Sequence, residues 1–308
     1  MTQYIIRRLA IIPPILLLAN FLGFSYAHYF RPLRDIYNPY ASAVITTPPL
    51  FSEYLSYLED LTRLELGVMP TGEPILDLLI RTSIASAGLL VISLVLSAVA
   101  GLLLGLSAVK LSPPRVASWL TFMGTVGLAS PSFYIGILFI SFSILYLISG
   151  LGRQPLLPFQ GYGWDAHLVL PVLALMAQPT VKVAQVTAGL LVGELGKQYV
   201  IAARSFGLSL PTIKRRHAFR NIIVPVVLTV AGSLRLLIAE LIIIERLFSW
   251  PGLGRVISTT LVVTSHSENY LLPSLFSALV TIVVALILAT DFLAAIAIRA
   301  YDPRLGTS

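Results

Sequence analysis

Few residues in this sequence are of the types that carry out catalysis or bind metals. The chain has 308 residues, no cysteine and four histidines, which are scattered at His28, His167, His217 and His266. Without cysteine there are no thiolate nucleophiles, disulfides or cysteine-ligated metals. No second histidine or carboxylate stands at ligand spacing near His217. We therefore expect no catalytic residue, no metal site and no cofactor on this chain, and a structural or docking role for His217.

Enzymatic motifs are also missing. An intramembrane enzyme would need a serine paired with lysine or histidine, paired aspartates, or a zinc motif such as H-E-x-x-H, and the sequence holds none of these. It also lacks the nucleotide-binding pattern G-x-x-x-x-G-K-[ST]. The sequence therefore argues against an enzyme.

Four charged residues interrupt apolar stretches: Lys182, Arg235, Glu240 and Asp291. A charge at the centre of a bilayer costs about 3 kcal/mol or more, so each needs a compensating partner or a wet environment. Two interpretations of Lys182, Arg235 and Glu240 stay open. They could line a translocation path, or Glu240 could form an internal ion pair with Lys182 or Arg235. We assign Asp291 to structure.

Membrane helices are the elements that must position these residues. Hydrophobic residues make up 56% of the chain and charged residues 11%, against about 25% charged in an average soluble domain. A helix needs about 20 apolar residues to cross a bilayer. We predict one all-α transmembrane domain, 1–308, with six spans at 9–27, 83–109, 128–149, 168–193, 222–244 and 271–298. Arg7 and Arg8 precede the first span as in a secretion signal, but no cleavage site follows, so we expect a retained helix.

The third span needs a break before it. The apolar stretch 117–149 is too long for one straight crossing, and Ser130-Pro131-Ser132 lies within it. A proline inside a helix kinks or ends it. We expect a helix along the membrane edge, followed by the third span.

The distribution of basic residues orients the six spans. With the N-terminus in the cytoplasm, the outer segments hold more acidic than basic residues, which is the asymmetry of the positive-inside rule. The net charge of +7 thus reports membrane orientation, with both termini cytoplasmic, and no nucleic-acid partner is expected. The cytoplasmic segments then hold most of the 21 basic residues: Arg7, Arg8, Lys110, Arg115, Lys197, Arg204, Lys214, Arg215, Arg216, Arg220, Arg299 and Arg304.

Two connections between spans have predictable local structure. Residues 29–81 form a small extracytoplasmic lobe, in which 51–66 carries leucines three residues apart and so predicts a short amphipathic helix. Residues 194–221 form a basic cytoplasmic segment. Its composition predicts a helix over 199–205, a turn at Gly207, and a second helix that begins near the candidate cap Ser209.

The residues that follow the fifth span cannot form a regular helix. Ser249, Trp250, Pro251, Gly252 and Gly254 lie within six positions. An irregular backbone in lipid would leave polar groups unsatisfied, so this turn must face protein or a water-filled vestibule. It could be an outer gate, or an ordinary interfacial turn anchored by Trp250.

Four stretches resemble, in order and spacing, the peptide and nickel permease family of ABC importers, in its first-subunit branch. They are Ala202 to Ser209 with Arg216 to Asn221, Glu245 to Arg255, Ser130 to Phe133, and Asp302 to Arg304. The resemblance covers about residues 66–304. It departs from the family at Ile201, where the broader motif has glutamate, at Arg31 to Asp35, and at Lys182 and Arg235.

The resemblance implies the type I ABC importer permease fold in a bacterial inner membrane. It implies four kinds of contact: a second related permease, two ABC ATPase subunits that hold ATP and Mg, an extracytoplasmic solute-binding protein, and lipid. It also implies that 194–221 is a coupling loop that rests in a cleft of an ATPase. Without the resemblance, its basic residues would be read as contacts to lipid headgroups. The docking residues would be Ala202, Ala203, Arg204, Gly207, Arg216, His217 and Arg220.

The solute stays open, because importers of dipeptides, longer peptides, glutathione-like compounds, nickel chelates and oligosaccharides share these motifs. A secondary transporter driven by ions is the alternative function. It would carry membrane charges without a docking loop, and usually inverted repeats.

Overall fold

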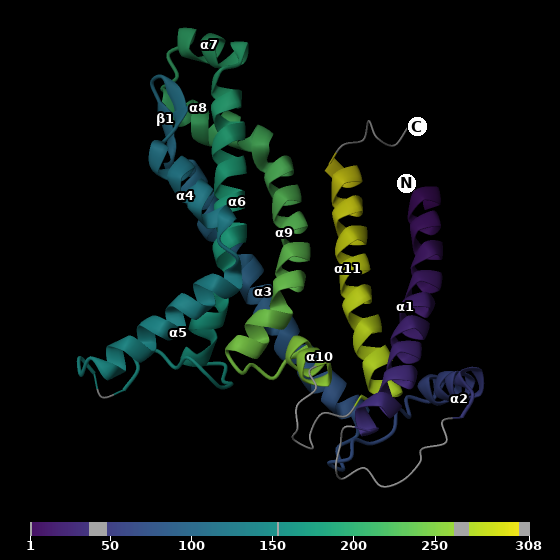
Figure 1. Cartoon of the computed structure of the whole chain (residues 1–308). Helices are drawn as coiled ribbons and strands as arrows, with labels where there is room; N and C mark the ends of the chain where they lie inside the picture. The colour runs from purple at the N-terminus through teal and green to yellow at the C-terminus, as the bar shows by residue number, and fades with distance from the viewer. Residues whose placement is uncertain (1, 37–47, 153, 262–270, 302–308) are drawn as a thin grey trace. The chain divides into compact units, whose positions relative to one another are not determined.

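The structure is a computed structural model that describes residues 2–36, 48–152, 154–261 and 271–301 (Figure 1). The regular secondary structure of its described part is helical apart from one short hairpin of two antiparallel strands, β1 (Val109–Leu111) and β2 (Pro114–Val116). The long helices are α1 (Thr2–Ile36), α3 (Ile75–Ser107), α6 (Val169–Leu195), α9 (Phe219–Leu247) and α11 (Pro273–Tyr301). The shorter ones are α2 (Leu50–Thr62), α4 (Ser118–Ala129), α5 (Ser132–Ile148), α7 (Gln198–Ser205), α8 (Leu210–Ile213) and α10 (Leu253–Leu261).

The prediction of an all-α membrane protein is confirmed. Among the described residues, five helices are long and apolar enough to cross a membrane, or six if the pair α4 and α5 counts as one span. The helices extend beyond the predicted spans at most ends. Because α1 runs to Ile36 and α3 begins at Ile75, the connection between them is shorter than the predicted lobe 29–81.

The predicted break before the third span lies where the proline places it. Helix α4 ends at Ala129 and α5 begins at Ser132, and the two axes are bent by 94°. The side-chain amide of Gln178 on α6 donates to the backbone carbonyl of Ser130 at 2.9 Å. A neighbouring helix therefore satisfies the backbone group that the break sets free.

The chain folds into two compact units. One contains residues 1–88 and 249–289, and the other contains 89–248 and 290–308. In the first unit, Asn20 in the middle of α1 is buried and all its polar atoms are used. It donates to the hydroxyls of Tyr57 (3.1 Å) and Thr281 (3.0 Å) and accepts from the hydroxyl of Tyr54 (3.2 Å). This network joins α1, α2 and α11.

Helix α2 is the amphipathic helix that the leucine spacing predicts, although it ends at Thr62 and so is shorter than 51–66. Its buried face carries Tyr54 and Tyr57, which pack around Phe24 of α1 with ring centroids 5.2 and 5.1 Å apart. Nearer the end of α1, His28 Nδ1 lies 2.6 Å from Glu53 Oε2. Aromatic packing and one short polar contact therefore hold α2 against α1.

In the second unit, α3 packs closely on α6 through two glycines spaced four residues apart. A Cβ added at Gly101 would lie 2.7 Å from the carbonyl oxygen of Thr180, and one at Gly105 would lie 2.7 Å from that of Ala184. Small residues at this spacing let membrane helices approach closely, which compensates for the weak hydrophobic driving force in lipid. This glycine pair was not among the predicted residues.

The close approach predicts that Gly105→Ala destabilises the protein. Because the new methyl group meets backbone on α6, the overpacking should cost about 1–3 kcal/mol. Gly189→Ala on α6 is the matched control, since nothing lies within 4 Å of the added atom. The midpoint of thermal unfolding in detergent should fall for the first variant and hold or rise for the second. Equal midpoints would contradict the packing.

Candidate docking surface and membrane charges

The connection between α6 and α9 contains the predicted helix and glycine turn. Helix α7 covers Gln198–Ser205, and Gly207 follows it at φ +83°, a left-handed conformation that glycine adopts without strain. Ser209 takes the position before α8, but its hydroxyl lies 2.9 Å from that of Thr212 and makes no capping bond. The predicted helix, turn and cap position are confirmed, although the Ser209 side chain makes no capping bond.

The second predicted helix has no boundary with the fifth span. Helix α8 continues through a π-helical turn, η2 (Lys214–Ala218), directly into α9, and the continuous helix covers Leu210–Leu247. The predicted division between 194–221 and 222–244 therefore has no structural counterpart. A π turn inserts one residue into the helical register and is frequent at functional sites.

One side of this connection is buried against the rest of its unit. Val200, Ile213 and Ala218 are almost completely buried, and Ala218 belongs to an apolar cluster with Leu191 and Leu195 of α6. The ammonium of Lys214 donates to the carbonyl oxygen of Leu106 in the last turn of α3, at 2.5 Å. The connection is therefore anchored from within.

The other side is exposed and partly apolar. Phe206 is 87% exposed and Ile201 65% exposed, and α7 lies across the end of α6 (Figure 1). Of the predicted docking residues, Ala203 is half-buried and the others are exposed: Ala202, Arg204, Gly207, Arg216, His217 and Arg220. We define the exposed surface of 201–208 as the α7 tip. Phe206 and Ile201 were not among the predicted docking residues, although both are large apolar side chains in a polar connection.

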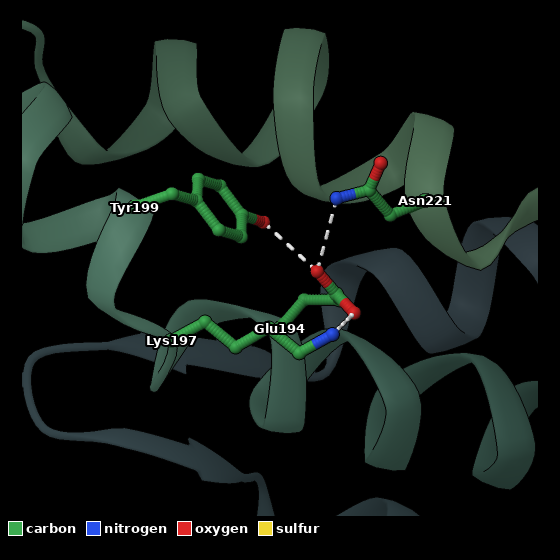
Figure 2. Close-up of polar contacts among 4 residues, drawn as sticks. All are labelled: Glu194, Lys197, Tyr199 and Asn221. Atoms are coloured by element: carbon green, nitrogen blue, oxygen red, sulfur yellow. Dashed lines mark hydrogen bonds and ion pairs between the residues drawn. The ribbon is translucent and has the colours of Figure 1, made fainter.

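Glu194, in the last turn of α6, is the polar centre of this region (Figure 2). Its Oε1 forms an ion pair with the ammonium of Lys197. Its Oε2 accepts hydrogen bonds from the hydroxyl of Tyr199 at 3.0 Å and from the amide of Asn221 at 3.1 Å. Burial raises the pKa of Tyr199, and the hydrogen bond to Glu194 raises it further. The phenol therefore stays protonated and donates. Glu194 was not among the predicted site residues.

Among the residues that it describes, the structure does not contain the ion pair of Glu240 with Lys182 or Arg235 that one of the two interpretations predicted. Arg235 on α9 forms an ion pair with Asp291 on α11, so the predicted pairing of Arg235 with Glu240 is wrong. Lys182, in the middle of α6, is exposed and has no ion-pair partner within the described ranges. Glu240 is half-buried, and its Oε2 has no hydrogen-bond partner among the described residues.

The turn after α9 faces protein. Trp250 is fully buried, and its indole nitrogen donates to the carbonyl oxygen of Ala85 at 3.1 Å. The amide of Leu253 donates to the hydroxyl of Ser86 at 2.8 Å. Trp250 is therefore no anchor at the lipid interface, and that interpretation is wrong. The outer-gate interpretation of Ser249, Pro251, Gly252 and Gly254 stays a prediction.

Comparison with known proteins identifies the family. The model of the family described as "Binding-protein-dependent transport system inner membrane component" matches residues 97–306. The chain belongs to this family. The predicted resemblance is thereby confirmed: the protein is a membrane-spanning permease subunit of an ABC importer with the type I permease fold.

Curated relatives include permease subunits of named transport systems. The glutathione transport system permease protein GsiC of Escherichia coli O6:H1 is 28% identical over 273 residues, which are 83% of this chain and 86% of the relative. The dipeptide transport system permease protein DppB of Lactococcus lactis subsp. cremoris is 27% identical over 208 residues, which are 67% of this chain and 66% of the relative.

Truncating a side chain should affect stability differently on the two sides of the connection. Phe206→Ala should leave the unfolding midpoint of the isolated permease unchanged, because the side chain contacts solvent. Ile213→Ala should cost about 2–5 kcal/mol, because it leaves a cavity at a fully buried site. Thermal unfolding in detergent measures both. A large loss of stability in Phe206→Ala would show that Phe206 belongs to the core.

Proposed function

We propose that this permease imports peptides or related small solutes such as glutathione, and that its α7 tip docks on a cytoplasmic ATPase subunit. The observation that carries the docking proposal is the exposure of Phe206, at 87%, on a segment whose other side is anchored. The proposed solute class rests on the relatives, which are named as glutathione and dipeptide permeases. Family membership favours ATP over an ion gradient as the energy source.

The α7 tip has the chemistry of a protein contact. Exposed apolar patches on a protein surface that faces water mark interaction sites. Aromatic and arginine side chains contribute most to the binding energy of interfaces. Phe206 would insert into an apolar socket, and Arg204 would contact acidic groups at its rim. Arg216, His217 and Arg220 would extend this contact along η2 and the start of α9. Ala202, Ala203 and Gly207 would allow a close approach of the two backbones.

Docking through the α7 tip would determine the membrane orientation of the chain and the positions of its partners. The α7 tip and both termini would be cytoplasmic, while α2 and the turn at Trp250 would lie on the outer side, which agrees with the charge asymmetry. Two ATPase subunits would hold ATP and Mg, so this chain would be non-catalytic. A second permease would form the other half of the pathway, and a solute-binding protein would deliver solute to the outer side.

The exposed charge of Lys182 fits a water-filled translocation path better than a surface that faces lipid. Lys182 lies in the middle of α6, about 20 Å from either helix end at 1.5 Å per residue, too far for its side chain to reach a headgroup. An exposed ammonium at that depth therefore needs water or a partner. We propose that Lys182 lines the path and attracts the carboxylates of passing solutes, with Arg235 and Glu240 beside it. The turn at Ser249 to Gly252, with Gly254 in the first turn of α10, would gate the outer end.

The docking proposal predicts which variant loses the ATPases. The permease is expressed with its second permease and ATPase subunits, and the recovery of ATPase after affinity purification in detergent is measured. Phe206→Ala should lower recovery by about tenfold or more, as expected for an interface hot spot. Arg204→Glu combined with Gly207→Pro should abolish it.

The matched control for this experiment is Leu151→Ala. Leu151 is an apolar residue of similar exposure, 75%, in the connection between α5 and α6. This variant should retain the ATPases, and the two permeases should associate in every case. Equal ATPase recovery from Phe206→Ala and Leu151→Ala would refute docking through the α7 tip.

The path proposal predicts a charge requirement at position 182. Lys182→Gln should reduce the uptake of labelled glutathione and dialanine into proteoliposomes by about five- to tenfold, since one favourable charge contact is lost. Lys182→Arg keeps the charge and should retain most uptake. ATPase recovery should be unchanged in both variants. If Lys182→Gln transports both solutes normally, the ammonium does not contact solute.

A further inference from the structure

Glu194 occupies a position that helix electrostatics disfavours. It lies in the last turn of α6, where the carbonyl end of a helix carries partial negative charge and repels a carboxylate. Its side chain is only 11% exposed, so water screens it little. A buried carboxylate is tolerated only where donors compensate for its lost hydration. The three donors around Glu194 supply this compensation.

These donors come from both ends of the connection. Lys197 immediately precedes α7, and Tyr199 lies in its first turn, whereas Asn221 lies in the first turn of α9. The bond from Asn221 to Glu194 joins residues 27 positions apart and closes the base of the loop. The bond from Tyr199 to the same oxygen attaches α7 to that base. One carboxylate therefore ties three helices together (Figure 2).

The covalent link alone would not hold α7 in place. Only Gly196 and Lys197 separate α6 from α7, and nothing lies within 3.5 Å of a Cβ placed on Gly196. Glycine gives a backbone link unusual freedom. A displacement of α7 could therefore be absorbed by rotation about this link, and α6 would not move with it. The Glu194 contacts restrict that freedom, together with the buried Val200 of α7.

We propose that Glu194 is a positioning residue that makes α7, the end of α6 and the start of α9 move as one body. A displacement of α7 would then move the membrane helices α6 and α9 together. This inference rests on the proposed docking of the α7 tip, and it assigns the transmission step to a residue that does not contact the ATPase. Coupling between the docking surface and the membrane helices requires a structural element whose arrangement both of them influence. The helix ends joined at Glu194 would form this element.

Hydrogen exchange in the complete transporter separates docking from transmission. The complex of this chain with its second permease and two ATPases is placed in nanodiscs, with and without ATP and vanadate. Protection of 198–206 reports that α7 is docked. The change in exchange over 219–234 on adding nucleotide reports that the start of α9 has moved.

Glu194→Gln keeps the side-chain shape and removes its charge. We expect α7 to remain protected, while the nucleotide-dependent change over 219–234 falls by about tenfold, a typical size for the loss of one coupling contact. ATP hydrolysis should continue, and uptake of labelled glutathione and dialanine per ATP should fall by a similar factor. Glu59→Gln, in the exposed ion pair with Arg63, is the control and should change neither quantity.

Tyr199→Phe is a second and milder variant that removes one hydroxyl. It should reduce transmission by less than Glu194→Gln, and the double variant should be no worse than Glu194→Gln alone, since both act through one contact. If α9 responds normally to nucleotide in Glu194→Gln, the inference is wrong although docking stands. If α7 is unprotected in the wild-type complex, docking itself fails. If Glu194→Gln alone loses the protection of α7, Glu194 serves docking and the inference is again wrong.

Discussion

Satisfaction of backbone polar groups in a medium without water is the constraint on which the rest of this structure depends. It explains why nearly all described elements are helices, since only a helix pairs its own backbone within one segment. Where a helix breaks, a neighbour supplies the missing partner. Gln178 donates to the carbonyl of Ser130 at the break between α4 and α5, and the backbone amide of Leu253 donates to the hydroxyl of Ser86 at the turn after α9. The irregular segments are therefore fixed parts of the fold.

Charged side chains obey the same rule with larger penalties. Arg235 pairs with Asp291, and Glu194 has three donors, so both lie in compensated environments. Lys182 has no such partner within the described residues, and its exposure in the middle of α6 sets it apart. A charge that is paired within the fold stabilises the fold. A charge that stays exposed in the middle of a membrane helix can contact a passing solute or a neighbouring helix.

Local chemistry in the sequence predicted the helices, the break at Ser130 to Ser132 and the turn at Gly207, because hydrophobic run length, proline and glycine act over a few residues. Pairings between distant residues were not predictable in this way. Arg235 lies five residues from Glu240 in the sequence, yet it pairs with Asp291 on another helix. The Glu194 contacts and the fit of Gly105 on α6 likewise depend on tertiary packing, which one sequence does not display.

The connection between α6 and α9 has one side buried in the fold and one side exposed. Ile213 and Ala218 are fully buried, and Lys214 is bonded to α3, so the inner side contributes to stability. Phe206 contributes nothing comparable, because water surrounds it in the isolated chain. Exposing a phenylalanine costs free energy, which burial against a partner would recover. A rigid base beneath an exposed aromatic tip is the arrangement that loses least entropy on binding, because few groups remain to be ordered.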